Sequence, residues 1–430
     1  MELLSNYKIH ISLEAVVVAI IFGISLINSV MLIVSSIIVC VFLIIYNQKS
    51  IGAIKALIFI SIRSILSLGI APSYDSYGII KWLIIFLLSL LLVFAGFNIG
   101  NKLTKQFLIL ISCFALYVVI SGFITSGYPI ISSFKVFSWI FVFCAIIIGV
   151  SNNPYFEWIK YVCNYLNYII IFSPFAFVLG IAYLKNGHAF QGILNHPNML
   201  GIITSLAFAL NLHLIKNKWS MMRLFIMVLC FVECLLTESR TGAITIIICF
   251  FVSLFLGMEK GWKKVLLIVV VSFLCLILLL SGIEEDILSY LYKGQSVGNL
   301  LYSRENQIAR AIEKFQANEL FGSGFMVPIN YSGKSYTFSF DLLVEPGNII
   351  ATLLGDIGIV GTIFFCIPYG LLATHLNKRD ILLFVTPFMA SMGEMLFFST
   401  NNVAIIYYLM FAVCLTRNKS DEFNKINFIK

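Results

Sequence analysis

Apolar runs follow one another along almost the whole chain, and they predict membrane helices. A helix needs roughly 20 mostly apolar residues to cross a bilayer. Runs of this kind predict about twelve to fourteen spans, depending on whether the short runs 29–46 and 400–416 are counted. The predicted spans are 12–28, 29–46, 51–70, 79–97, 106–122, 129–150, 164–184, 198–215, 221–237, 239–257, 264–282, 348–372, 380–398 and 400–416. With no visible repeat or linker, residues 1–430 are expected to form one all-α polytopic membrane domain.

One long polar interval, residues 283–345, interrupts this pattern. It contains an amphipathic segment, Leu301 to Asn318, followed by Phe321-Gly322-Ser323-Gly324-Phe325. A long loop within a compact fold is usually functional or disordered. The amphipathic segment and the glycine turns favour a functional loop.

The positions of Lys and Arg predict the orientation of the spans. Positive residues collect in cytoplasmic loops, and here they occupy alternate connecting segments. They are Lys8, Lys49, Lys102, Lys105, Lys160, Lys216, Lys218, Arg223, Lys260, Lys263, Lys264, Lys378, Arg379, Arg417, Lys419, Lys425 and Lys430. This asymmetry predicts an even number of spans, both termini in the cytoplasm, and an outward-facing 283–345 loop.

Composition supports the membrane assignment and excludes other classes. The chain is 60% hydrophobic and 11% charged, whereas soluble domains are about 25% charged. The net charge of +8 is mostly the topology signal, so nucleic-acid binding is disfavoured. The ten cysteines lie in or beside apolar runs and are interpreted as small core residues, not as a disulfide or zinc framework. The first apolar run is expected to be a retained helix, not a signal peptide.

Several cations break the topology rule, because they lie at the outer ends of predicted spans or in the outer loop. They are Arg63, Lys81, Lys135, Arg240, Arg304 and Arg310. Charges within a membrane are expensive and usually face a cavity and a partner. One interpretation is snorkelling, or ion pairs with Glu238, Asp75 or Glu394. The other is a shared anionic ligand, for which the planar Arg fork suits phosphate. A diphosphate lipid headgroup is negatively charged and lies at the membrane depth of these cations.

The amphipathic segment has an arginine on its apolar face. Arg304, Ile308, Ala311 and Phe315 share one helical face, while Arg310 points elsewhere and can pair with Glu313 or Asn306. The segment is either an interfacial helix lying on the bilayer or a lid over an outward cavity with Arg304 directed into it.

Two residues are candidates for a base. His196 lies in Asn195-His196-Pro197-Asn198, where a capping or turn role is the alternative. Glu345 lies just before the span that opens at Asn348, where a favourable interaction with the helix dipole is the alternative. The spacing of His and carboxylate residues predicts no metal site. The chain has no Walker A, Gly-x-Ser-x-Gly, His-Glu-x-x-His or Asp-x-Asp motif, which disfavours an ATPase, a serine hydrolase and a nucleotide-sugar transferase.

An ordered series of motifs resembles the O-antigen polymerase and ligase superfamily over roughly residues 190–400. The series is Asn195 to Asn198, Thr237-Glu238-Ser239-Arg240-Thr241-Gly242-Ala243, Arg304 to Phe325, and Gly347-Asn348 to Gly361. The resemblance implies a bacterial multispan glycosyltransferase of the GT-C fold in the cytoplasmic membrane. Its donor would be a polyprenyl-diphosphate-linked glycan, without metal or cofactor. Arg240 and Arg304 would bind the lipid diphosphate.

One departure from the family pattern bears on whether the reaction is that of a ligase or of a polymerase. Ligases of this group carry a histidine where this chain has Gly347, and Glu345 is the nearest acid. This favours a polymerase of O-antigen or capsule repeat units. In that hypothesis Arg240, Arg304, Arg310 and Lys135 hold the diphosphate, and Glu345, ahead of His196, is the base. Glycan transfer to another acceptor and a lipid-linked oligosaccharide flippase remain alternatives. Membrane lipid, a chain-length regulator and a separate flippase are the expected partners.

Overall fold

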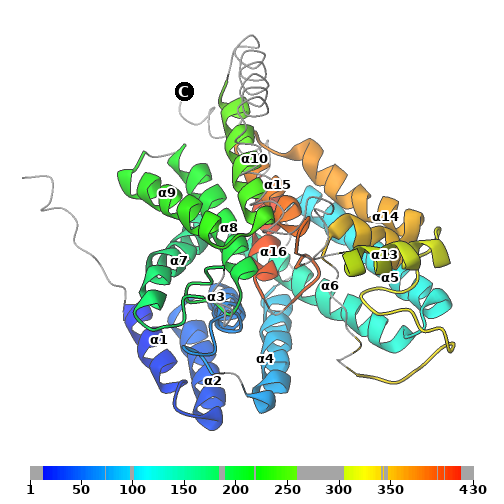
Figure 1. Cartoon of the computed structure of the whole chain (residues 1–430), viewed down its shortest axis with the longest axis horizontal. Helices are drawn as coiled ribbons and strands as arrows, with labels where there is room; N and C mark the ends of the chain where they lie inside the picture. The colour runs from blue at the N-terminus through cyan, green and yellow to red at the C-terminus, as the bar shows by residue number, and fades with distance from the viewer. Residues whose placement is uncertain are drawn as a thin grey trace, which may run out of the picture.

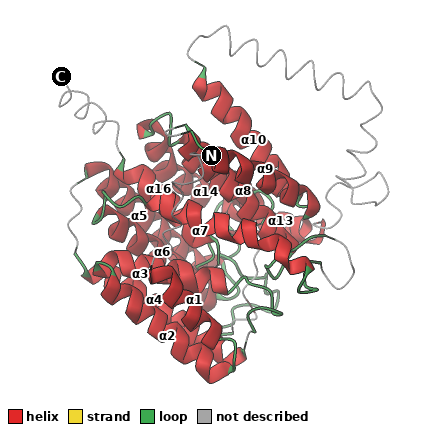
Figure 2. Cartoon of the chain, turned by 90° about the vertical axis from the view of Figure 1, so that its left-hand side faces the viewer, coloured by secondary structure: helices red, strands yellow, loops and turns green. Residues whose placement is uncertain are grey.

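The protein folds into packed α-helices, and the part of the chain described by this computed structural model contains no β-strand (Figures 1 and 2). The described residues are 13–72, 74–96, 101–183, 189–216, 219–258, 305–339, Leu342, 347–394, 396–400 and 402–417. The predicted span 264–282 and part of the 283–345 loop, namely 283–304, 340–341 and 343–345 with Arg304 and Glu345, lie outside them.

The structure describes the following helices in chain order. Their bounds are α1 (Leu13–Ile24), α2 (Ser29–Tyr46), α3 (Lys49–Arg63), α4 (Asp75–Phe94), α5 (Lys102–Thr125), α6 (Pro129–Ser151), α7 (Trp158–Phe172), the 3₁₀ helix η1 (Ser173–Phe177), α8 (Pro197–Ile215), α9 (Met221–Leu236), α10 (Arg240–Gly257), α13 (Glu305–Ala317), α14 (Ile349–His375), α15 (Ile381–Ser391) and α16 (Ala404–Thr416).

Among the described residues, seven helices are long and apolar enough to cross a bilayer, namely α2, α4, α5, α6, α8, α10 and α14. The helices α1, α15 and α16 are shorter but also apolar. The prediction of an all-α polytopic membrane protein is therefore confirmed.

The structure shifts one predicted span. The apolar run 164–184 predicts a single helix, but α7 begins earlier, at Trp158, and ends at Phe172. The chain then continues as η1, which contains Pro174. Proline has no amide hydrogen to donate within a helix, so the regular α-helical ladder ends here although the side chains remain apolar.

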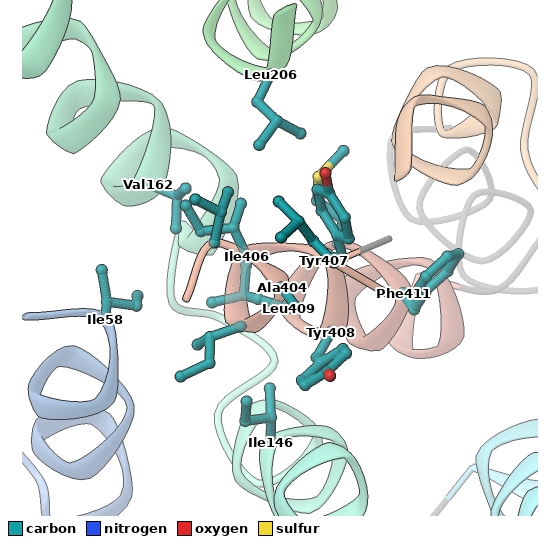
Figure 3. Packing of buried hydrophobic residues seen from close by; sticks show 14 of the residues in the cluster. Ile58, Ile146, Val162, Leu206, Ala404, Ile406, Tyr407, Tyr408, Leu409 and Phe411 are labelled. Atoms are coloured by element: carbon teal, nitrogen blue, oxygen red, sulfur yellow. The ribbon is translucent and has the colours of Figure 1, made fainter. Parts of the chain in front are cut away.

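The core is organised around α16. Every residue from Ala404 to Leu415 is buried, as expected for a helix that is hydrophobic on all sides. Figure 3 shows α16 surrounded by Ile58 of α3, Ile146 of α6, Val162 of α7 and Leu206 of α8. Figure 1 shows the same arrangement at low magnification, with α16 central, α1 to α4 on one side, α7 to α9 on another, and α5, α13 and α14 on a third.

Candidate functional site

A break in the helical backbone lies beside this central helix. The apolar runs 380–398 and 400–416 predict two helices that almost touch, but α15 ends at Ser391 and α16 begins at Ala404. The connecting residues Leu396 to Thr400 are buried. Irregular backbone at membrane depth is tolerated only where protein buries it or where it lines a cavity, so this break needs support from its neighbours.

Polar contacts from two helices supply part of that support. The Tyr408 hydroxyl lies 3.0 Å from the carbonyl oxygen of Phe397 and 2.6 Å from that of Ser399. On the α3 side, the Ser61 hydroxyl donates to the carbonyl oxygen of Asn402. The ring of Phe398 packs edge-on against Trp139 of α6. The break is thus held by the following helix, through Tyr408, and by Ser61 and Trp139, which are distant in sequence.

The start of α8 also meets this break. Pro197 occupies the first turn of α8, where its missing amide hydrogen costs nothing. His196 caps the helix, because its Nδ1 accepts a hydrogen bond of 3.1 Å from the Asn198 amide. The side-chain amide of Asn198 donates to Glu394 Oε1 at 2.6 Å. A motif residue of α8 thereby holds a carboxylate of the break.

The start of α10 lies against the same place. Ser239 caps α10 by accepting a 3.3 Å hydrogen bond from the Gly242 amide. A Cβ on Gly393 would lie 1.5 Å from Thr241 Oγ1, so only glycine allows the break to approach α10 this closely. Gly393 therefore packs against Thr241, the second residue of α10, and the half-buried Arg240 is the residue before it.

The start of α14 completes the arrangement. The Asn348 side chain caps α14 by accepting from the amides of Ile350 at 2.9 Å and Ala351 at 3.1 Å. Its side-chain amide donates to the carbonyl oxygen of Met392 at 2.9 Å. We call the meeting place of Asn198, Arg240, Asn348 and Glu394 the polar junction. It joins three motifs that are far apart in the sequence.

Two of the other predicted cations form a neighbouring group. Arg63 is buried at the end of α3, where one Nη donates to the carbonyl oxygen of Pro72 at 3.3 Å and the guanidinium lies over the Tyr77 ring. Lys81 is half-buried one turn beyond Tyr77. The segment after α3 pairs with the one before α8, because the Asn195 amide donates to the Ile65 carbonyl at 2.9 Å. This pairing brings the end of α3 to the start of α8.

The remaining site predictions fall in three places. Lys135 is buried on α6, one turn from Ser132, whose hydroxyl accepts from the Phe325 amide. His196 is exposed. Arg310 is exposed on α13 and lines a separate cavity that includes none of the junction residues. Arg304 and Glu345 lie outside the described residues.

A second polar cluster fixes α13 on α14. Lys314 of α13 is buried and donates to the carbonyl oxygens of Gly324 and Val327, each at 2.8 Å, and to the Asp356 carboxylate. The other Asp356 oxygen accepts from the Met326 amide at 2.7 Å. An ammonium group has three donors, so this lysine is fully satisfied. We call Lys314, Asp356 and the loop 318–327 the α13 anchor.

The anchor forms where α14 is interrupted at Gly358. This residue has φ of 68° and ψ of −173°, a conformation that is accessible to glycine. The loop supplies the missing backbone bonds: Glu319 and Leu320 accept from the Ile359 and Val360 amides, and Ser323 and Gly324 donate to the Gly355 and Asp356 carbonyls. The Phe-Gly-Ser-Gly-Phe motif and the glycine-rich motif of α14 therefore bind each other.

Sequence analysis missed two residues of these clusters. It treated Glu394 only as a partner for a cation, although an acid within an apolar run is itself a functional signal. It did not single out Lys314, which lies beside Ala311 on the face of α13 that contacts α14. As for metal binding, the described residues contain no group of three His, Cys, Asp or Glu side chains that could hold an ion.

Comparison with known proteins agrees with the motif series. A family model described as O-antigen ligase matches residues 225–366, about a third of the chain. The matched region contains Arg240, α13 and Asp356, and thus parts of both polar clusters. The chain matches no curated protein. The resemblance to the O-antigen polymerase and ligase superfamily is therefore confirmed over residues 225–366, in a chain whose long apolar helices are those of a multi-pass membrane protein.

Proposed function

We propose that this protein is a membrane glycosyltransferase that polymerises polyprenyl-diphosphate-linked oligosaccharide repeat units. The reaction would occur on the outer face of the bacterial cytoplasmic membrane, with both termini of the chain in the cytoplasm. The observation that carries the proposal is the polar junction, where the starts of α8, α10 and α14 each contact the segment between α15 and α16, and where Asn198 of α8 binds the Glu394 carboxylate. Helix breaks at membrane depth are characteristic of substrate sites.

The diphosphate of the donor would lie at the cations on this side of the protein. Arg240 at the start of α10 is the principal ligand, with Arg63, Lys81, Lys135 and the loop residue Arg304 as further contributors. Guanidinium groups bind phosphate oxygens through two parallel hydrogen bonds. Positive groups fixed in a site of low dielectric also stabilise the charge that develops on the departing diphosphate. The buried positions of Arg63 and Lys135 support such a role.

The base must remove a proton from the attacking hydroxyl of the acceptor sugar. Sequence analysis favours Glu345 ahead of His196, and the contact with Asn198 adds Glu394 as a third candidate. The capping bond weakens the case for His196. Because its Nδ1 accepts the Asn198 amide, the neutral ring carries its proton on Nε2 and cannot accept another there.

The products would be a longer glycan on one lipid and a free polyprenyl diphosphate. The C–O bond to the donor diphosphate breaks, and the acceptor oxygen forms the new glycosidic bond while its proton passes to the base. The absence of the ligase histidine, replaced by Gly347, favours this polymerase reaction. Transfer to a separate acceptor is the second candidate, because the matching family model is described as O-antigen ligase.

Purified protein in liposomes with lipid-linked repeat units tests the proposal. We expect polymer to form without ATP or nucleotide sugar. The variant that lacks the base should lose roughly 10²-fold or more in rate while binding the donor normally. The variants to compare are Glu345→Gln, Glu394→Gln and His196→Asn, the last of which keeps a side chain that can cap α8.

The outcome also separates the alternatives. Glycan transfer only when a different acceptor is added would support the ligase reaction. A null strain that retains repeat units on the inner leaflet, together with no glycan transfer by the purified protein, would support a flippase and contradict an enzyme. Parental rates from both glutamate variants would show that neither carboxylate is the base.

A further inference from the structure

A cavity of about 270 Å³ lies between α13 and the loop that follows the anchor. Its polar side chains are Gln307, Arg310, Glu313 and Tyr331, and Val327 to Ile329 form an apolar wall. The buried pair of Lys314 and Asp356 lies at its base. A few fixed polar groups beside an apolar wall are typical of small-molecule sites, and this volume accommodates a single pyranose ring.

The aromatic residue of the cavity is held in place although it is exposed. Tyr331 is 77% exposed, and its hydroxyl donates to Glu313 across the cavity. That bond raises the pKa of Tyr331. An exposed ring fixed in this way offers a flat apolar face, while Arg310, Gln307 and Glu313 offer donors and acceptors around it. A sugar ring presents the complement, with C–H groups on its face and hydroxyls on its edge.

The charges of the cavity disfavour a diphosphate. Lys314 directs all three of its donors to Asp356 and two carbonyl oxygens, so it has none left for a ligand. The remaining charged side chains, Arg310 and Glu313, have opposite signs. A neutral ligand rich in hydroxyl groups fits this balance better than an anion does.

The cavity is also at a suitable distance from the polar junction. Asn348 and Asp356 belong to the same stretch of α14, and eight residues of helix span about 12 Å along the axis. A glycan whose reacting end lies at the junction can therefore extend along the first turns of α14 and reach the cavity with a sugar further along the chain.

We propose that this cavity is a saccharide subsite, which binds one sugar ring of the glycan substrate away from the reacting diphosphate. The identity of the glycan rests on the proposed function, but the binding itself does not require turnover. The subsite assigns Arg310 to sugar recognition instead of diphosphate binding. Its aromatic contact is Tyr331, and its hydrogen-bonding groups are Arg310, Gln307 and Glu313.

The test measures binding of an oligosaccharide that lacks both lipid and diphosphate. The probe is the repeat unit released by mild acid from the polysaccharide of the producing cell, added to the full-length protein in nanodiscs and followed by saturation-transfer NMR and calorimetry. We expect saturable binding that weakens at least about tenfold in Tyr331→Ala and Arg310→Ala. Tyr336→Ala is the matched control, because Tyr336 is exposed on the same loop but does not line the cavity, and it should bind as the parent does.

Two further measurements make the result decisive. The Arg240→Ala variant should bind the free oligosaccharide with the parental affinity. Millimolar inorganic diphosphate should not displace the bound oligosaccharide from the parent protein. Equal binding by the parent and Tyr331→Ala, or displacement by diphosphate, would overturn the subsite even if the protein makes polymer. Cavity-dependent binding in a protein that makes no polymer would keep the subsite and contradict only the proposed function.

Discussion

The polar junction and the α13 anchor both bury polar groups where a helix is interrupted, but they satisfy those groups differently. At the anchor, Lys314 and Asp356 have a partner for each donor and for both carboxylate oxygens, and the backbone groups freed at Gly358 are paired with the loop. Beside the junction, the buried hydroxyls of Thr400 and Tyr407 find no hydrogen-bond partner among the described residues.

This difference supports a structural role for the anchor and the proposed binding role for the junction. A fully paired buried charge has no capacity for a ligand, and its partners hold two segments together. Buried polar groups without partners are uncommon and call for an explanation such as a ligand or a water molecule. We propose that a ligand or a water molecule pairs with the hydroxyls of Thr400 and Tyr407 beside the junction, whereas the anchor fixes α13 on α14. Four sets of variants test the comparison.

Removal of the anchor lysine should have the largest effect on stability. Lys314→Ala leaves Asp356 buried without its cation, which costs about 3–5 kcal/mol. The variant should therefore accumulate poorly and melt at a lower temperature in detergent, as followed by the loss of the monomer peak. Lys314→Leu combined with Asp356→Leu should recover much of the stability, because neither charge is then buried. Melting of Lys314→Ala at the parental temperature would show that the pair is not a stabilising contact.

Removal of the junction arginine should affect the reaction and not the fold. Arg240→Ala is expected to lower the rate of polymer formation about 10²–10³-fold, the usual loss for one group that stabilises transition-state charge. Arg240→Lys should also lose most of the rate of polymer formation, because lysine lacks the planar guanidinium group that donates two parallel hydrogen bonds. Lys378→Ala is the matched control, because it also removes one positive charge, but from an exposed residue on a connecting segment. Unchanged polymer length from Arg240→Ala would remove the diphosphate hypothesis.

Two glycines of α14 should respond with opposite signs to the same substitution. Gly358→Ala places a Cβ 2.4 Å from the Leu320 carbonyl oxygen at a positive φ, and it should destabilise the protein by about 1–3 kcal/mol. A Cβ on Gly370 meets no atom within 4 Å. Gly370→Ala should therefore be neutral or stabilise by up to about 1 kcal/mol. Thermal melting of the two variants side by side provides the measurement, and equal shifts would contradict the role of Gly358.

The smallest effect is expected for the cap of α14. Asn348→Ala removes the cap and the bond to Met392, with a cost of about 1 kcal/mol in stability. Asn348→Ser can still cap the helix but cannot donate to Met392. If the contact with the break matters for the reaction, both variants should lower the rate, and only Asn348→Ala should lower the melting temperature. Parental rates of polymer formation from both variants would show that the contact of Asn348 with Met392 has no role in the reaction.

Much of the fold was predictable from sequence because hydropathy is a local property. The transfer free energies of neighbouring side chains add along the chain, so apolar runs of sufficient length identify α2, α5, α6 and α14 without knowledge of their neighbours. Helix starts are also local. Pro197 is the first residue of α8 and Asn348 caps α14, as their residue types predict.

The contents of the two polar clusters depended on the tertiary structure. Residues 392–403 lie at the end of one apolar run and the start of another, and only contacts from Ser61, Asn198, Asn348 and Tyr408 make a non-helical path tolerable there. The ion pair of Lys314 and Asp356 could not be predicted from the sequence either, because 42 residues separate the two along the chain. Hydrogen bonds and ion pairs join residues by distance in space, so the sequence specified the helices and the fold decided which polar groups meet.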